Sequence, residues 1–281
     1  MDAAVGNYAH YRAGPGSWAL GRFVVPVNRI AELEAAARPH FSSPRGHSGW
    51  PLAALVGPAV DTDLASVASF NSRYSSTAPP FVIDSLELKA SSVSALETLL
   101  GGIPPHLQAY IEIPINGDPS DLISVLAKAG RRAKVRTGGV TPDAFPRGSD
   151  LIRFMAACIR AGVPFKATAG LHHPLGAEYN LTYASDSPRG RMFGFLNLLL
   201  AAAFLQAGMA ERQAERVLEE GLLEAFQVED QMVQWGGERL TLAHLRRARE
   251  QALVSFGSCS FTEPLEELQA MHLLDSRVAQ A

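Results

Sequence analysis

Short apolar runs alternate with longer helical segments between residues 22 and 169 of this 281-residue chain. Six of the runs are almost continuously hydrophobic, as expected of parallel strands that are covered on both faces. We predict strands at residues 22–28, 50–57, 81–89, 108–115, 132–137 and 163–169. We predict helices at residues 30–38, 61–74, 93–100, 120–129 and 150–161. Six successive strand–helix units imply an α/β protein with a parallel sheet and right-handed crossovers.

The length and this regularity favour a single domain, residues 1–281, with the (β/α)8 (TIM) barrel fold, which typically needs about 250 residues. An open doubly wound sheet is the alternative. The last third is less regular, and the seventh strand cannot be placed. Here we expect a polar loop at 176–191, helices at 190–210, 211–226 and 242–251, a hairpin around Gly236-Gly237, a closing strand within 252–261 and a terminal helix from 262.

The composition of the chain argues against several classes of protein. Hydrophobic residues make up 47% of the chain and charged residues 19%, which suits a packed globular core. The net charge of −3 argues against nucleic acid as a partner. The apolar stretch 192–209 is about long enough to span a bilayer, but Asn197 and Gln206 interrupt it, so we expect a buried helix and no membrane association. Two cysteines and no visible signal peptide indicate a cytoplasmic protein without a disulfide framework.

Charged residues inside the predicted strands are the strongest functional signal. Lys134 and Lys166 lie 32 residues apart, each within a β-type run that ends in glycine. Alternate strand residues of a barrel point inward, and the site lies at the C-terminal ends of the strands. On that rule the interior receives Glu87, Lys89, Glu112, Lys134, Arg136, Lys166 and Thr168. Charges of both signs in one cavity suit acid–base chemistry; a structural ion-pair network is the alternative.

The segments Lys-Val-Arg-Thr-Gly-Gly at 134–139 and Lys-Ala-Thr-Ala-Gly at 166–170 resemble the paired lysine motifs of deoxyribose-phosphate aldolase and related Schiff-base aldolases. The resemblance covers residues 133–171. It implies a class I aldolase-like TIM barrel in which Lys134 forms the imine and Lys166 lowers the pKa of its amine. Arg136 stands where those aldolases carry a small hydroxyl residue, and Lys166 competes for the role of nucleophile.

Two further groups are candidates for the site. His172 and His173 follow the sixth predicted strand; on an extended backbone they point in opposite ways, so one at most enters the site. Glu87 and Glu112 with one of these histidines would form a divalent-metal site. The small-residue segments could bind an anion; they comprise Thr137, Gly138, Gly139, Gly257 and Ser258. Cys259, in the second of them, is only a weak indication of a nucleophile.

The sequence therefore predicts an aldolase-like lyase that acts on a small carbonyl substrate through a lysine Schiff base, without a cofactor. Its catalytic groups would be Lys134, Lys166, Glu112, Glu87 and His172. Its substrate-binding groups would be Lys89, Arg136, Thr137, Gly138, Gly139, Thr168, His173, Gly257 and Ser258. A metal-dependent lyase or isomerase and a non-catalytic metabolite-binding barrel are the alternatives. The expected partner is a small molecule, and self-association into a homo-oligomer is left open.

Overall fold

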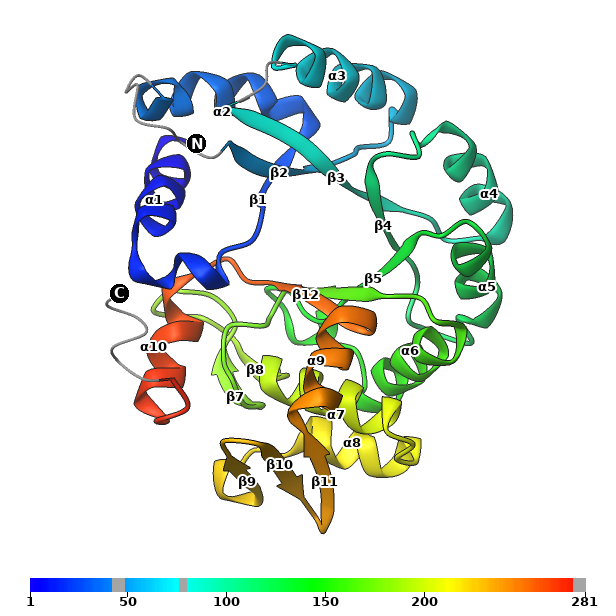
Figure 1. Cartoon of the computed structure of the whole chain (residues 1–281), viewed down its shortest axis with the longest axis vertical. Coiled ribbons are helices and arrows are strands. Elements are labelled where there is room, and N and C mark those ends of the chain that lie inside the picture. Colours follow the sequence, from blue (N-terminus) through cyan, green and yellow to red (C-terminus); the bar gives the residue numbers. More distant parts are fainter. Residues whose placement is uncertain (42–48, 76–79, 275–281) are drawn as a thin grey trace. The chain divides into compact units, whose positions relative to one another are not determined.

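The computed structural model describes residues 1–41, 49–75 and 80–274. Contacts divide the chain into two compact units. The first contains chiefly Met1–Lys89 and Glu97–Tyr110, and the second contains Ala90–Leu96 and Ile111–Leu268. Figure 1 shows the elements of both units in the colours of the sequence. The single domain expected from the sequence remains a prediction.

The first unit contains three strands that are followed or preceded by helices. Its aromatic core includes Trp50, Phe70 and Phe81, which lie close to one another. The elements from its first segment are α1 (Asp2–Ala13), β1 (Phe23–Pro26), α2 (Ile30–Ala37), β2 (Trp50–Leu55), α3 (Val60–Arg73) and β3 (Phe81–Lys89). The chain then continues through α4 (Val93–Gly102) and β4 (Gln108–Glu112).

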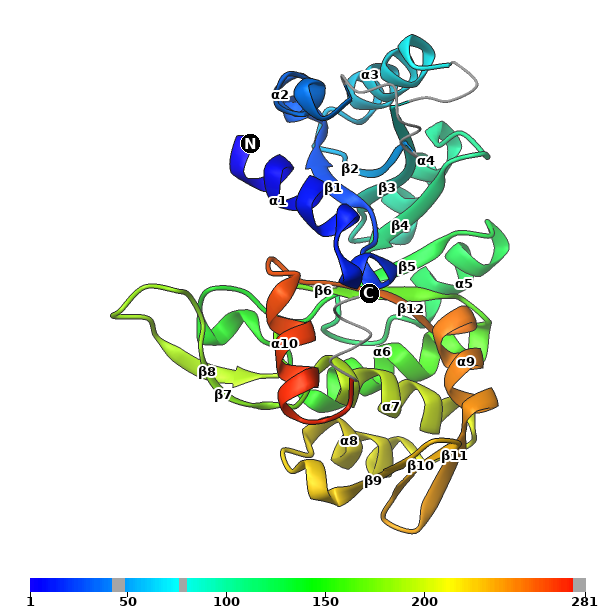
Figure 2. The ribbon, with the colours of Figure 1, turned by 60° about the vertical axis from the view of Figure 1, so that its left-hand side comes forward.

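The second unit packs a layer of helices against its strands, as Figure 2 shows for α6 and α7 below β6 and β12. Its first elements are α5 (Ser120–Lys128), β5 (Arg132–Arg136), α6 (Gly148–Ala161) and β6 (Phe165–Thr168). The later elements are β7 (Ala177–Asn180), β8 (Arg189–Met192), α7 (Phe195–Gln206), α8 (Glu211–Glu219), β9 (Phe226–Glu229), β10 (Met232–Trp235), β11 (Glu238–Thr241), α9 (Leu242–Gln251), β12 (Leu253–Gly257) and α10 (Thr262–Ala270). Buried aromatic rings join the layers: Phe154 of α6 meets Phe165 of β6 edge to face at 5.5 Å.

The main sheet has seven strands in the order β1-β2-β3-β4-β5-β6-β12. The β1–β2, β2–β3, β5–β6 and β6–β12 pairs are parallel. The order follows the chain without reversal, so the doubly wound alternative is wrong, because such a sheet reverses its strand order at a switch point. The eight strands of a closed barrel are not shown. Residues 169–252, all of them described, contribute no strand between β6 and β12.

The first six strand–helix units agree with the sequence prediction to within a few residues at each boundary. Apolar periodicity is strong there, and α6 ends where predicted, at Gly162, whose φ of 65° is left-handed. Residues 192–209 contain the buried helix α7, as predicted. None of the described helices is long and apolar enough to cross a membrane.

The last third holds both confirmed and incorrect predictions. The predicted loop at 176–191 is instead the antiparallel hairpin β7–β8, whose strands also displace the predicted start of the following helix. The hairpin around Gly236-Gly237 is confirmed as β10–β11, and β9 adds a third strand to it. Polar and apolar residues alternate along β9–β11. This alternation is typical of an antiparallel sheet with one solvent-exposed face, and not of a seventh barrel strand. The closing strand is confirmed as β12 and the terminal helix as α10.

Candidate active site

Strands β5 and β6 bring the two strand lysines side by side. Lys134 and Lys166 are direct register partners in this parallel pair. Neighbouring strands lie about 4.8 Å apart, and register partners present their side chains on the same face. Both lysines are buried, with 8% and 7% of their surface exposed. Two buried lysine side chains therefore leave neighbouring strands on the same face of the sheet in the second unit.

A carboxylate from β4 extends this row. Nζ of Lys134 lies 2.9 Å from Oε2 of Glu112, with 9% and 12% of the two side chains exposed. On the other side, β12 places Ser255 opposite Lys166. A buried charge is costly unless it is paired, so Glu112 stabilises the charged form of Lys134. We call Glu112, Lys134 and Lys166 the lysine row.

The next positions on the same face of these strands hold Arg136, Thr168 and Gly257. Arg136 is the register partner of Thr168, and Gly257 of β12 is the partner of Thr168 on its other side. Arg136 is exposed and Thr168 is half-buried. Because side chains alternate along a strand, the guanidinium of Arg136 lies on the same face as the lysines, at the C-terminal end of β5.

Thr137 is tied to the backbone that follows β6. Its side chain is buried, and its hydroxyl donates to the carbonyl of Ala169 at 2.7 Å. Ala169 and Gly170 both have left-handed backbones, with φ of 74° and 72°. This conformation is unfavourable for alanine, so the turn after β6 stores strain next to the lysine strand. The hydroxyl proton of Thr137 is used within the protein rather than offered to a ligand.

The glycines after β5 pack tightly against a neighbouring segment. A Cβ on Gly138 would lie 2.5 Å from the ring of Phe145, and one on Gly170 would lie 2.8 Å from the same ring. A Cβ on Gly139 would lie 2.6 Å from Cβ of Ala144. Close packing accounts for these glycines, and the anion-binding role predicted for Gly138 and Gly139 remains a prediction.

His172 and His173 both contact α10. Nδ1 of His172 lies 3.0 Å from Oε2 of Glu263, and Nδ1 of His173 lies 2.6 Å from Oε1 of Glu267. The two glutamates are four residues apart and therefore lie on one face of the helix. The prediction that the histidines point in opposite ways is wrong, because the chain bends here instead of continuing as a strand.

The β7–β8 hairpin adds two tyrosines to these pairs. The ring of Tyr179 stacks on His173 with 3.5 Å between centroids and 13° between planes. The hydroxyl of Tyr183 donates to Oε2 of Glu263 at 2.8 Å, the same oxygen that His172 contacts. The segment predicted as a polar loop at 176–191 is thus a hairpin that contacts both His–Glu pairs.

The thiol of Cys259 also contacts the His172 ring, with its sulfur 3.8 Å from Nδ1. Sγ of Cys259 is 3.4 Å from Nε2 of His172, and Oγ of Ser258 is 3.4 Å from Nδ1. Cys259 is exposed, whereas the other cysteine, Cys158, is buried, and neither is in a disulfide. We call Cys259, His172 and Glu263 the thiol cluster.

The carboxyl of Glu263 is held in its ionised form. Partial burial acts to raise its pKa, but the hydrogen bonds with Tyr183 and His172 outweigh burial and bring the pKa below the usual 4.5. For Tyr183, desolvation and the contact with Glu263 raise the pKa of the phenol. At neutral pH a carboxylate therefore faces Nδ1 of His172, and a protonated tyrosine donates to it.

The histidine segment is anchored to the start of α7. The N–H of Phe195 donates to the carbonyl of His173, and the N–H of Leu196 donates to the carbonyl of Pro174, both at 3.0 Å. The first amides of a helix have no partner within the helix. Here they bind the segment that carries the histidines.

Asn197, in the same first turn of α7, is fully buried and makes three hydrogen bonds. Its Oδ1 accepts from the N–H of Gly176 at 2.9 Å. Its Nδ2 donates to the carbonyls of Val217 at 2.9 Å and Glu220 at 2.8 Å. The amide of Asn197 therefore connects α7 to the residue that precedes β7 and to the C-terminal end of α8.

Glu87 and Lys89 lie on β3, in the first unit. Glu87 is buried and Lys89 is exposed. That these two residues belong to one site with the lysine row remains a prediction.

Within residues 1–41, 49–75 and 80–274, no three His, Cys, Asp or Glu side chains are grouped so as to hold a metal ion. The predicted metal set of Glu87, Glu112 and a histidine draws on both units and remains a prediction.

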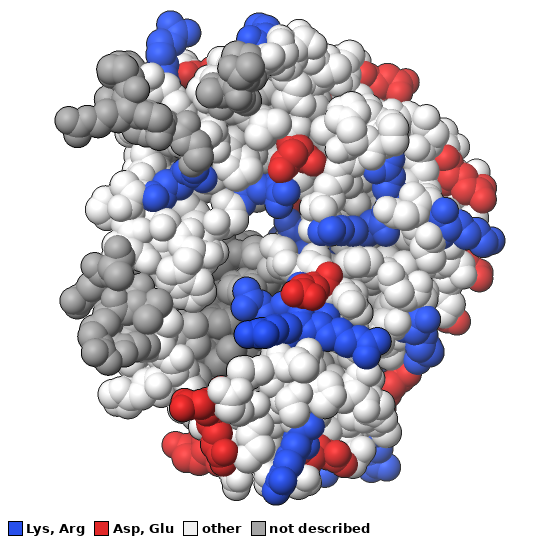
Figure 3. All heavy atoms as spheres, in the orientation of Figure 1, with Lys and Arg blue, Asp and Glu red and all other residues white. Residues whose placement is uncertain are grey.

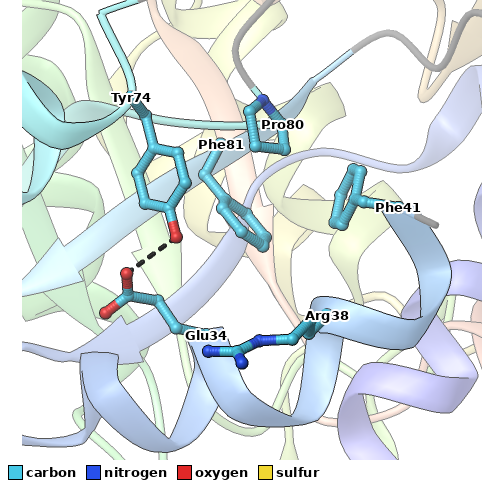
Figure 4. A pocket seen from close by; sticks show the side chains of 6 residues that line it. All are labelled: Glu34, Arg38, Phe41, Tyr74, Pro80 and Phe81. Atoms are coloured by element: carbon cyan, nitrogen blue, oxygen red, sulfur yellow. Dashed lines mark hydrogen bonds between the residues drawn. The ribbon is translucent and has the colours of Figure 1, made fainter.

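The first unit has a pocket of about 240 Å³. In Figure 4, Tyr74 points at Glu34, and its hydroxyl donates to Oε1 at 2.8 Å. None of the sequence-predicted site residues lines this pocket. Its lining residues are Glu34, Arg38, Phe41, Tyr74, Pro80 and Phe81.

Charges of both signs are spread over the face of the molecule in Figure 3, with a short run of basic side chains over the region of β12 and α9. The α9 sequence, LAHLRRAREQ, contains three arginines. Acidic groups lie on either side of this run in the same view.

Sequence reasoning missed Glu263, Glu267 and Tyr183 and undervalued Cys259. The available signal was weak: two glutamates one helical turn apart, four and eight residues after a cysteine in a Gly-Ser-Cys-Ser segment. Their histidine partners are 91 and 94 residues away along the chain. No family model, curated protein or solved structure matches this chain.

Proposed function

We propose that the protein is a lyase that acts on a small carbonyl compound through a lysine Schiff base. The observation that carries this proposal is the register pairing of two buried lysines, Lys134 and Lys166, on adjacent strands. Like charges side by side destabilise a sheet, and buried ammonium groups are costly. Val, Ile or Leu would fill these positions more favourably, so a chemical role explains the pair better than a structural one.

Lys134 has the carboxylate of Glu112 beside its amine, which suits it to act as the cation of the lysine pair. A carboxylate at 2.9 Å favours the ammonium form of Lys134. An amine that lies beside another cation is more readily obtained in its neutral, nucleophilic form. We therefore assign Lys166 as the nucleophile and Lys134 as the neighbouring cation. This assignment reverses the roles that the resemblance to aldolases implies.

The reaction follows from these positions. The neutral amine attacks the carbonyl carbon and water leaves, which forms the imine. The imine nitrogen, once protonated, accepts the electron pair of the breaking carbon–carbon bond while a base takes the proton of the β-hydroxyl group. One fragment then leaves as an aldehyde or ketone, and the other remains on the lysine as an enamine. Protonation of the enamine carbon forms the imine again. Glu112 is positioned to exchange a proton through Lys134, with which it is in contact. Hydrolysis of the imine then releases the carbonyl product and restores the amine.

Arg136 indicates the substrate class. It is exposed, on the same face as the lysines and two residues beyond Lys134. A guanidinium there would bind a carboxylate or phosphate on the substrate. In this proposal the protein is a cytoplasmic enzyme with a (β/α)8-type fold, which the unreversed order of its seven strands supports.

Reductive trapping tests the proposal. The full chain is incubated with acetaldehyde, acetone or dihydroxyacetone phosphate, then reduced with sodium borohydride, and adducts are located by peptide mass spectrometry. We expect an adduct on Lys166 with at least one of these probes. Lys166→Met should abolish it, and Lys134→Met should slow its formation by about tenfold or more.

Lys128 provides the matched control, because it is an exposed lysine on α5. Lys128→Met should leave trapping unchanged. The imine proposal fails if no probe forms an adduct, or if adducts persist at the same level when both row lysines are replaced by Met. An adduct confined to Lys134 would keep the chemistry and reverse our assignment. If the function of the protein persisted in Lys134→Met and Lys166→Met and both variants had a higher free energy of unfolding, the protein would be non-catalytic.

A further inference from the structure

Three separate segments bring a thiol, an imidazole and a carboxylate into contact. Cys259 follows β12, His172 follows β6, and Glu263 is in the first turn of α10. Sγ to Nε2 is 3.4 Å and Nδ1 to Oε2 is 3.0 Å. We infer that the thiol cluster is a second reactive site, in which Cys259 is a nucleophile for activated acyl groups, that is, esters or thioesters.

The hydrogen bonds define the role of each imidazole nitrogen. Glu263 is ionised at neutral pH and can only accept, so Nδ1 of His172 carries the proton that binds it. Nε2 then presents its lone pair, and this is the nitrogen nearest to Sγ of Cys259. A nucleophile in contact with a base, which is in turn oriented by a third group, is the arrangement that acyl transfer requires.

Access also favours this reaction. Cys259 is exposed, so a substrate reaches its sulfur without a change in the fold. Cys158 shows the opposite case, because complete burial raises the pKa of its thiol and excludes reagents. Tyr183 binds the same carboxylate oxygen as His172, so we assign Glu263 and Tyr183 as positioning residues.

The reaction balances with water as the second reactant. His172 takes the thiol proton, and the thiolate sulfur bonds to the acyl carbon while the bond to the alkoxide or thiolate leaving group breaks. The leaving group takes the proton from His172. Water then attacks the thioester, with His172 as the base, which releases the carboxylic acid and restores the thiol. This site uses none of the lysine row, so it stands independently of the proposed lyase reaction.

The probe is p-nitrophenyl acetate with the full chain, followed by release of p-nitrophenol and by peptide mass spectrometry. We expect a burst of p-nitrophenol and an acetyl group on Cys259, while Cys158 stays unmodified. Cys259→Ala should abolish the burst. His172→Gln should slow acylation by about 100-fold or more, as loss of a general base does.

The neighbouring His173–Glu267 pair is the matched control, because it has the same groups on the same helix but stacks on Tyr179 instead of facing a thiol. Glu267→Gln, which leaves both histidines in place, should acylate at the wild-type rate. Glu263→Gln should slow acylation about tenfold and change its dependence on pH, and Glu263→Asp should restore part of the rate. The titratable groups that face His172 or Glu263 in that profile are Tyr183, Cys259 and His173.

Alkylation by iodoacetamide provides a second measurement that needs no acyl chemistry. Wild type should react at Cys259 faster than His172→Gln, with both proteins showing the same thermal unfolding. Acetyl transfer to other residues only, or equal alkylation rates in wild type and His172→Gln, would overturn the inference. Fast alkylation without any acylation would overturn the acyl substrate class.

Discussion

The lysine row and the thiol cluster are built in opposite ways. The lysine row lies on strands, is buried and is set by sheet register, so neighbouring strand residues become neighbours in space. The thiol cluster lies on a turn, a bend and a helix start, is partly exposed, and is held by side-chain hydrogen bonds across about 90 residues of chain. A buried charge can therefore be predicted from the residue pattern of its strand, whereas a site formed by loops depends on tertiary contacts.

The largest expected effect concerns the ion pair of the lysine row. Glu112→Leu leaves the Lys134 ammonium buried without this carboxylate, and we expect a loss of about 3–5 kcal/mol in the free energy of unfolding. The double variant Glu112→Leu/Lys134→Met should recover most of this loss. Urea unfolding of both single variants and the double variant gives the coupling energy. A double variant as unstable as Glu112→Leu would show that the pair is not the origin of the cost.

Asn197 tests whether the two sites are separable. Asn197→Leu leaves the Gly176 N–H and two carbonyls without their partner, and we expect a loss of about 2–3 kcal/mol. The histidine segment should loosen, so acylation of Cys259 should slow while borohydride trapping at the lysine row persists. Urea unfolding and the two labelling assays check this. If trapping fell as much as acylation, the two regions would form one site.

Ala169 connects the two regions, and its backbone is strained. Left-handed alanine costs about 1–2 kcal/mol, and glycine removes that cost at an entropic penalty of about 0.5–1 kcal/mol. Ala169→Gly should therefore raise the free energy of unfolding by about 0.5–1 kcal/mol. Chemical unfolding measures it, with Ala161→Gly in helix α6 as a control that should destabilise. A destabilised Ala169→Gly would mean that the turn is not strained.

The smallest expected effect is on acid stability. The pKa of Glu263 is lower in the folded protein than the usual 4.5, so the unfolded chain binds a proton first as the pH falls. The stability that Glu263 contributes is therefore complete above about pH 4.5 and is lost as the pH falls through its folded pKa. Glu263→Gln should remove this part of the acid sensitivity, about 0.5 kcal/mol for a partly exposed group. Urea unfolding at pH 7 and pH 3.5 compares it with Glu267→Gln, and a wild-type pH dependence in Glu263→Gln would contradict the assignment.

The sequence predicts most of the first six strand–helix units because their apolar periodicity reflects local geometry. The prediction is wrong at 176–191, where the polar residues are typical of a loop. The hairpin there is stabilised by the groups it contacts, which are distant in the sequence. The lysine row could be predicted because Lys134 and Lys166 break the hydrophobic pattern of their strands. Cys259 could not be connected to His172, since no local pattern records that the ends of β6 and β12 are neighbours. The terminal helix from 262 could be predicted, but its pattern does not show that Glu263 and Glu267 contact the histidines.

The hydrogen bonds from the first turn of α7 to His173 and Pro174 have a dynamic consequence. The amides of Phe195 and Leu196 can exchange with solvent only when the histidine segment leaves the helix. Opening of the segment and fraying of the helix are therefore one event, with one free energy. The imidazole that faces Cys259 is consequently held for as long as the buried helix α7 keeps its first turn, although the segment that carries it has no regular secondary structure of its own.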